Sequence, residues 1–454
     1  MCAYSYIYYV VRAVLLGVMG VLLSTTSVLS GSNLTLTDAV HLAQTNDPWL
    51  EGNVHMQQAL EADSIGAAQL PDPTVSVGWI NVPTDTFDND QEPMTQLKVG
   101  INQVFPRGDT QQLKQKQIQQ TSARYPYMRA DRRAKVALTV SQQWLDAYRY
   151  GESIRLIEQD RKLFEQLVEV ALSSYSSVSG STSNQDVVRA QLELTRLEDR
   201  LLQLRMQQDI VREQLGEWLE WGDYSTEHSL AIDQLPSIAL PAVLATQADV
   251  ATVSHHLRSH PLIVGMDQKI TASETTVALR QQLYKPQWGI NASYGFRQDD
   301  QLGEDRADFF SIGVQFDLPL FTDKRQDQRV RSATSMAEAV KTEKMLALRA
   351  LQAQFEASYA QLQQLNQRKA LYKDRLLKEI DDQAEAALGA YTHDRGDFSE
   401  VVRARIVALN ARIDQLNIEV DRLKVMAQIN YFFASSEVES LAAAGAHHPE
   451  FHHE

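Results

Sequence analysis

Hydrophobic and polar side chains alternate one by one in four short segments of this chain, residues 74–82, 97–102, 288–296 and 310–318. A period of two residues predicts β-strands that each have one apolar face and one small or polar face. The apolar positions are Val75, Val77, Trp79, Leu97, Val99, Ile101, Trp288, Ile290, Tyr294, Phe310, Ile312, Val314 and Phe316. The pattern therefore predicts four amphipathic strands, in two pairs that are far apart along the chain.

The longest segments have the spacing of helices instead. Residues 107–175 and 321–391 are rich in Gln, Leu, Ala, Arg and Glu. Their apolar residues recur every three or four positions, as Val136, Val140 and Trp144 do. This spacing predicts helices that pack side by side along their whole length.

Each long segment ends in a turn that contains glycine, Gly180 in the first and Gly396 in the second. Residues 187–215 and 401–429 then regain the helical spacing, so each pair of segments predicts an antiparallel helical hairpin. Pro126 predicts a break early in the first long helix. We expect a mainly α-helical protein with two long hairpins and four strands.

The two halves repeat one another at an offset of 213 residues. Three prolines and one glycine of the first half coincide with the same residue types in the second half without any gap. The pairs are Pro48 and Pro261, Pro73 and Pro286, Pro106 and Pro319, and Gly100 and Gly313. A tandem repeat of this length predicts two halves with one architecture.

The repeat sets the expected domain boundaries. Residues 31–220 form the first repeat, 221–247 a connecting segment and 248–434 the second repeat. Residues 1–30 are expected to be an export signal, because an arginine precedes a short apolar core and small residues follow it. A retained N-terminal anchor helix is the alternative. Residues 435–454 form a histidine-rich tail that is expected to be disordered.

The strands have the length and pattern of membrane strands. Each segment has about 10 residues, which is what a tilted strand needs to cross a bilayer. We expect the apolar positions to face lipid and the positions between them, such as Asn102, to face a lumen. Four strands cannot close a barrel, so spanning strands would require an oligomer. Half-buried strands of a soluble sandwich remain the alternative.

Composition excludes several classes of function. A formal net charge of -15 is opposite to what nucleic-acid binding needs, and it suits a conduit for cations. No glycine-rich phosphate loop, paired-cysteine metal site or HExxH motif is present, so we expect no enzyme and no cofactor. His255, His256 and His260 precede Pro261 and are expected on the surface at the start of a helix.

The stretch LPDPTVSVGWINVPTD, followed by EPMTQLKVGINQVFPRG, resembles the TolC-like outer-membrane efflux channels, and in particular the CzcC/CusC-like branch that serves heavy-metal pumps. The resemblance covers the whole mature chain. It implies a homotrimer in the outer membrane, with a 12-stranded transmembrane β-barrel above a long periplasmic α-helical barrel. It also implies a periplasmic adaptor (membrane fusion) protein and an inner-membrane pump of the resistance-nodulation-division (RND) type. The chain departs from many members of this branch because no cysteine follows the signal.

The resemblance also assigns roles to the hairpin tips, YSSVSGSTSNQDVVRAQ and YTHDRGDFSEVVRAR. The expected adaptor contacts are Val178, Gly180, Arg395, Gly396 and Phe398. The expected entrance and gate residues are Glu400, Asp186, Asp397 and Arg403. Glu400 matches an acidic ring, whereas Arg403 stands where the family is often acidic. The alternative for Glu400 and Asp186 is that they only complement the start of a helix.

The tail contains His447, His448, His452 and His453, which could collect metal cations; a solvated tail is the alternative. The sequence therefore predicts a passive exit duct for heavy-metal cations. The same fold could export drugs or polypeptides, as in type I secretion. A soluble periplasmic coiled-coil scaffold or adaptor is the alternative from another class of protein.

Overall fold

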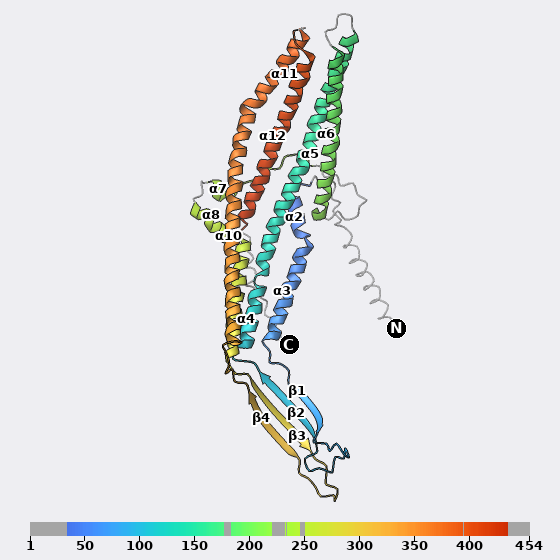
Figure 1. The fold of residues 1–454 in the computed structure, drawn as a ribbon. Coiled ribbons are helices and arrows are strands. Elements are labelled where there is room, and N and C mark those ends of the chain that lie inside the picture. The colour runs from blue at the N-terminus through green and yellow to red at the C-terminus, as the bar shows by residue number, and fades with distance from the viewer. Residues whose placement is uncertain are drawn as a thin grey trace, which may run out of the picture.

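The computed structural model describes residues 34–176, 183–219, 232, 234–245, 250–393 and 395–434. It is an elongated bundle of long helices that carries a four-stranded sheet at one end (Figure 1). The expected export signal, residues 1–30, and the histidine-rich tail lie outside the described residues, as do most residues of the expected connecting segment.

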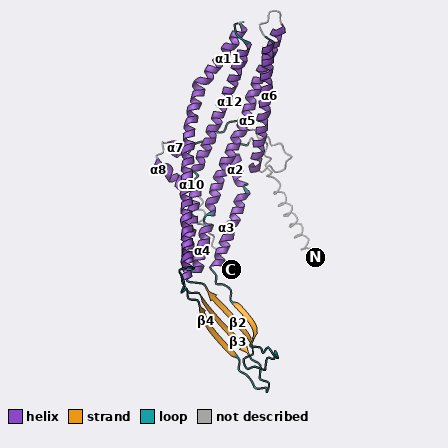
Figure 2. Ribbon diagram, viewed as in Figure 1, coloured by secondary structure: helices purple, strands orange, loops and turns teal. Residues whose placement is uncertain are grey.

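The elements follow one another in the same order in both halves. The first half contains α2 (Leu36–Thr45), α3 (Pro48–Ala67), β1 (Thr74–Ile80), β2 (Gln96–Phe105), α4 (Thr110–Ser122), α5 (Tyr125–Ser176) and α6 (Asn184–Leu219). The second half contains α7 (Ala242–Ala245), α8 (Val250–Arg258), α9 (Pro261–Gln281), the 3₁₀ turn η1 (Gln282–Tyr284), β3 (Trp288–Phe296), β4 (Phe309–Phe316), α10 (Gln326–Leu371), the π-helical turn η2 (Tyr372–Leu376), α11 (Leu377–Thr392) and α12 (Phe398–Phe432). Helices and strands occupy separate parts of the molecule (Figure 2).

The long helices break in two different ways. In the first half the break near Pro126 is confirmed, because α4 ends at Ser122 and α5 begins at Tyr125. In the second half the expected single helix contains the π-helical turn η2 instead. No proline or glycine lies within this turn, so no local residue pattern predicted it. Beyond the turn, α11 leans toward the start of α12 at the tip of the hairpin (Figure 1).

The four strands form one antiparallel sheet in the order β1-β2-β3-β4. Residues directly opposite one another point to the same face of a sheet. Val77 pairs with Val99, Val99 with Tyr294, and Tyr294 with Phe310. One continuous apolar row therefore crosses all four strands, and β1 and β4 are left as the edges of the sheet.

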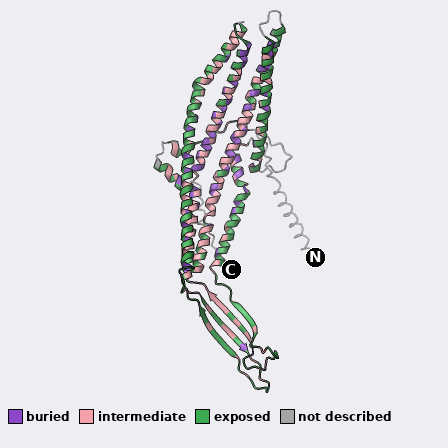
Figure 3. Ribbon diagram, in the orientation of Figure 1, coloured by how far each residue is buried: buried purple, intermediate pink, exposed green. Residues whose placement is uncertain are grey.

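The hydrophobic core runs along the helices. Helix α12 lies against α5, α10 and α11, and Val401, Val420 and Phe432 on it are fully buried. Burial follows this central helix, whereas α6 and α10 expose most of their outer faces (Figure 3). Among the described residues, no helix has the length and apolarity of a membrane span.

Candidate functional site

The tips of the two hairpins lie together at the end of the bundle opposite the sheet (Figure 1). Phe398, at the start of α12, is 3% exposed and packs edge-on against the ring of Tyr391, with 5.5 Å between ring centroids. Val187 near the start of α6 belongs to the same hydrophobic cluster. Phe398 is thus buried between the two tips in the single chain, and its role as an adaptor contact stays a prediction.

A tight turn connects α11 to α12. The amide of Arg395 donates to the carbonyl oxygen of Ala390 over 3.0 Å, which closes the end of α11. A methyl group on Gly396 would lie 2.9 Å from the Cβ of Ala390 and 2.9 Å from the amide nitrogen of Tyr391. The chain therefore approaches itself too closely for any larger residue, and Arg395 and Gly396 are exposed at the tip.

Asp397 caps the N-terminus of α12. Its carboxylate accepts a hydrogen bond from the amide of Ser399 at 3.0 Å and another from the Ser399 hydroxyl at 2.9 Å. These two donations hold the pKa of Asp397 below its usual value, and the charges of Arg189 and Arg403 lower it further. Asp397 thus stays ionised and fixes the start of the helix.

Glu400 and Arg403 form an ion pair at 2.6 Å, one turn apart on α12. Both side chains are more than half exposed, so the pair adds little stability. The pair does place the positive charge of Arg403 beside Glu400. The structure brings the two residues together, and their role in a gate stays a prediction.

Asp186 has the geometry of a helix start. Its carboxylate accepts from the amide of Ser183 at 3.0 Å and from the Ser183 hydroxyl at 2.6 Å. These bonds fix the first turn of α6, and the role of Asp186 at the entrance stays a prediction. Val178 and Gly180, which precede Asp186 in the sequence, lie outside the described residues.

At the opposite end, the sheet has one apolar and one polar face. The strand register places all thirteen residues expected to face lipid on the apolar face. Their exposed fractions reach 71%, at Ile312, and the rings of Trp288 and Phe316 lie 4.9 Å apart. A large exposed apolar face of this kind is typical of a surface that contacts a membrane or another protein.

Solved structures of outer-membrane channels share this architecture. The chain superposes on the outer-membrane channel OprN with a TM-score of 0.74 at 14% identity, covering 88% of this chain and 90% of that one. It superposes on CusC with a TM-score of 0.71 at 14% identity, covering 87% and 91%. For the outer-membrane protein VceC of Vibrio cholerae the TM-score is 0.70 at 14% identity, with coverage of 88% and 96%. No protein-family model and no curated protein matches the sequence.

This chain has the TolC-like channel fold. The long helices and the four-stranded antiparallel sheet of this chain match that fold. The fold-class prediction is confirmed for the single chain.

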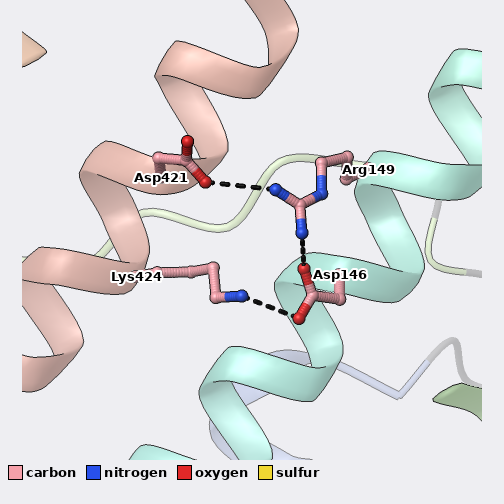
Figure 4. Close-up of polar contacts among 4 residues, drawn as sticks. All are labelled: Asp146, Arg149, Asp421 and Lys424. Atoms are coloured by element: carbon pink, nitrogen blue, oxygen red, sulfur yellow. Dashed lines mark hydrogen bonds and ion pairs between the residues drawn. The ribbon is translucent and has the colours of Figure 1, made fainter.

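Within the TolC-like fold, one charged network links the two repeats and was not predicted. Arg149 on α5 donates to Asp146 on the same helix and to Asp421 on α12, the latter over 3.1 Å. Lys424 on α12 donates to Asp146 over 2.7 Å. Figure 4 shows these four side chains between the two helices. Each helix contributes one acid and one base, so the seam between the hairpins is electrically balanced.

A second unpredicted cluster surrounds His260, which was expected on the surface. The structure buries its side chain completely, and Nε2 lies 3.1 Å from the carbonyl oxygen of Tyr431. The hydroxyl of Tyr431 donates to Asp131 over 2.9 Å. Burial lowers the pKa of His260. His260 lies at the start of α9 and Tyr431 lies on α12, 171 residues later. A local sequence pattern cannot indicate that two residues so far apart in the chain are in contact.

No cluster of three His, Cys, Asp or Glu side chains able to hold a metal ion occurs among the described residues. His447, His448, His452 and His453 lie outside those residues, so a metal role for the tail stays a prediction.

Proposed function

We propose that this chain is the exit duct of an efflux system in the outer membrane, and that it works as a homotrimer that catalyses nothing. One observation carries the proposal. A single four-stranded sheet exposes a continuous apolar face, opposite a small and polar face, at one end of a long helical bundle. A transmembrane barrel needs this distribution, with apolar residues toward lipid and polar residues toward the lumen.

The open edges of the sheet support a trimer. Strands β1 and β4 have no neighbour on their outer sides within the chain. Unpaired backbone groups are costly in lipid, so each β1 must pair with β4 of another copy. Three copies would close a barrel of 12 strands, within the range known for such barrels.

The helical hairpins support a long periplasmic portion. Helix α5 contains 52 residues and is therefore roughly 80 Å long. Its tip would lie far from the membrane, where a periplasmic adaptor and an inner-membrane RND pump could dock. The exposed Arg395 and Gly396 are the proposed contacts on the described part of the tip.

For the cargo we propose heavy-metal cations, on the basis of the net charge of -15 and the acidic Glu400 near the entrance. Organic drugs or polypeptides form the second candidate class. The ion pair between Glu400 and Arg403 favours that class, because it removes much of the attraction for cations.

Survival of a deletion strain tests the cargo. The strain would be grown with zinc, cobalt, cadmium, nickel, copper and silver salts, and with dyes and antibiotics in parallel. Sensitivity to metals alone supports the metal duct and identifies the ion. Sensitivity to dyes and antibiotics alone would support a channel whose cargo is organic compounds instead of metal ions.

Fractionation and electrophoresis test the channel itself. The proposal expects the protein in outer-membrane fractions and as a trimer that resists heat in mild detergent. It also expects discrete ion-conducting steps when the purified protein is added to planar bilayers. A monomer in the soluble periplasmic fraction would instead support the scaffold or adaptor alternative.

A further inference from the structure

The four described strands contain a single formally charged residue, Lys98. Its neighbours in β2, Leu97 and Val99, point to the apolar face. Lys98 therefore points to the polar face, which is otherwise occupied mainly by glycine, serine, asparagine and glutamine. A charge on this face would be directed into the duct.

The glycines of the polar face let uncharged side chains lie flat on the sheet. The Oγ of Ser76 lies 2.9 Å from where a methyl group on Gly100 would be, and the Oδ1 of Asn291 lies 2.7 Å from where a methyl group on Gly313 would be. These polar side chains cover backbone instead of projecting from it. The face is consequently smooth, which leaves room in the lumen.

Lys98 does not lie flat in this way. Its direct partners across the sheet are Gly78 and Gly295. A methyl group on Gly78 would meet no atom within 4 Å, so the Lys98 side chain does not cover that glycine. The place over Gly295 is occupied by the side chain of Gln96. The Lys98 side chain, which is partly exposed, therefore covers neither of its two partner glycines.

Lys98 has no direct ion-pair partner among the described residues. Asp317 lies beyond the end of β4 and is paired with Arg107, and no hydrogen bond or ion pair of Lys98 occurs within the described residues. The next charge on this face, just past β3, is Arg297, whose guanidinium lies 4.1 Å from the ring centroid of Phe309. Loop carboxylates such as Asp88 are exposed to water outside the strands.

We propose that Lys98 makes the strand-lined part of the duct select against cations. The inference rests on the proposed trimeric channel, in which three copies of Lys98 would form one ring inside the barrel. Neutral or anionic solutes would pass this ring most readily, and metal ions would pass it most readily as complexes without net positive charge. Rings of charged side chains set selectivity in other channels through the same Coulomb interaction.

The size of the effect follows from Coulomb's law. Three charges about 10 Å from a monovalent ion in water change its local concentration by about two- to eightfold, depending on how far salt screens them. The effect should grow as salt is diluted, because the screening length is about 10 Å at 0.1 M salt and longer below it.

Reversal potentials in planar bilayers test the proposal. The wild-type trimer would be measured in a KCl gradient beside Lys98→Gln, which removes the charge, and Lys98→Arg, which retains it. Lys324→Gln is the matched control, because Lys324 is an exposed lysine outside the strands. Heat-resistant trimers on a gel establish that each variant has assembled.

Because the ring lowers the local concentration of potassium and raises that of chloride by the same factor, the proposal expects the ratio of potassium to chloride permeability to rise about four- to sixtyfold in Lys98→Gln. Lys98→Arg and Lys324→Gln should stay close to wild type. An unchanged ratio in assembled Lys98→Gln, or an equal rise in Lys324→Gln, overturns the inference and leaves the channel intact. If the wild-type protein conducts no ions, the proposed function and the inference fail together. If Lys98→Gln fails to assemble while Lys98→Arg assembles normally, the charge is required for folding and assembly, and the inference about selectivity is overturned.

Discussion

Asp47 and His260 occupy the same place in the two repeats, 213 residues apart, and each caps the helix that begins at the next residue, a proline. The carboxylate of Asp47 accepts from the amide of Trp49 over 3.1 Å, and Nδ1 of His260 accepts from the amide of Leu262 over 3.2 Å. Both side chains are buried. The repeat thus retains a cap at this position while the residue that supplies it differs.

The cap formed by His260 depends on the protonation state of its ring. Because Nδ1 of His260 accepts an amide hydrogen, the ring proton is on Nε2, which donates to the carbonyl oxygen of Tyr431. Protonation would remove the acceptor and place a positive charge at the N-terminus of α9. Asp131 and Lys135 also lie nearby and are paired at 2.8 Å.

We predict that acid destabilises the protein through His260. Burial lowers the folded-state pKa of His260 below its ordinary value of about 6.5, so the fold favours the neutral ring. The resulting stability is present above about pH 6.5 and is lost as the pH falls through the folded-state pKa. Thermal unfolding of the detergent-solubilised protein between pH 7.5 and 4.5 should show this loss.

His260→Asn provides the control. An amide oxygen caps a helix start as well as a carboxylate does and does not titrate in this range. The stability of the variant should fall less than that of the wild type between pH 6.5 and 4.5. A pH profile that is parallel to wild type would show that other groups, such as Asp131, cause the decline.

Much of this fold could be predicted because its patterns are local. The period of two placed the strand at 288–296 where β3 (Trp288–Phe296) lies, and placed the other three strands within about three residues at either end. Parity alone assigned each strand residue to its face, since one face of a strand comprises every second residue. The repeat offset located the helix starts at Pro48 and Pro261.

The features that the sequence did not predict mostly depend on which helices contact one another. Asp146 and Arg149 on α5 have the same spacing as Asp421 and Lys424 on α12, but this spacing alone does not show that the two helices face one another. The π-helical turn η2 (Tyr372–Leu376) likewise has no local signal. His260 is buried because α12 covers it, which a local pattern cannot show.

The network in Figure 4 should stabilise the contact between the two hairpins. We predict that Arg149→Met lowers stability by about 1–3 kcal/mol, since it removes a charged donor to Asp421 and Asp146 from a partly buried site. The midpoint of thermal unfolding measures the loss. Asp421→Asn added to Arg149→Met should cost little more, because the two residues share one interaction.

Arg155→Met is the matched control for Arg149→Met. Arg155 lies on the same helix and pairs with Glu152, three residues earlier, over 2.7 Å. Within the described part of the chain, no hydrogen bond or ion pair joins Arg155 to α12. Its replacement should change the midpoint far less, because exposed pairs within one helix contribute little. Equal shifts in both variants would exclude a special role for the link to α12.

The two faces of the sheet should tolerate charge differently. We predict that Val99→Arg, on the apolar face, costs about 2–4 kcal/mol near the bilayer midplane and reduces the yield of heat-resistant trimer. Asn102→Arg places the same side chain on the polar face of the same strand and should assemble normally. If the two variants assemble equally well or equally badly, the assignment of the apolar face to lipid is wrong.

The tip residues should control the width of the entrance. Glu400 and Asp186 lie in the first turns of α12 and α6, the two helices that return from the tips, and Asp186 holds the start of α6 through Ser183. We predict that Glu400→Ala combined with Asp186→Ala removes two acidic groups from the entrance, loosens the start of α6 and raises the single-channel conductance in planar bilayers. Glu338→Gln is the control, because Glu338 forms a similar exposed pair with Lys341 at 2.9 Å on α10, outside the tips. Unchanged conductance in the double variant, or an equal rise in the control, would remove both acids from the gate and leave them as acidic residues of the first helical turns.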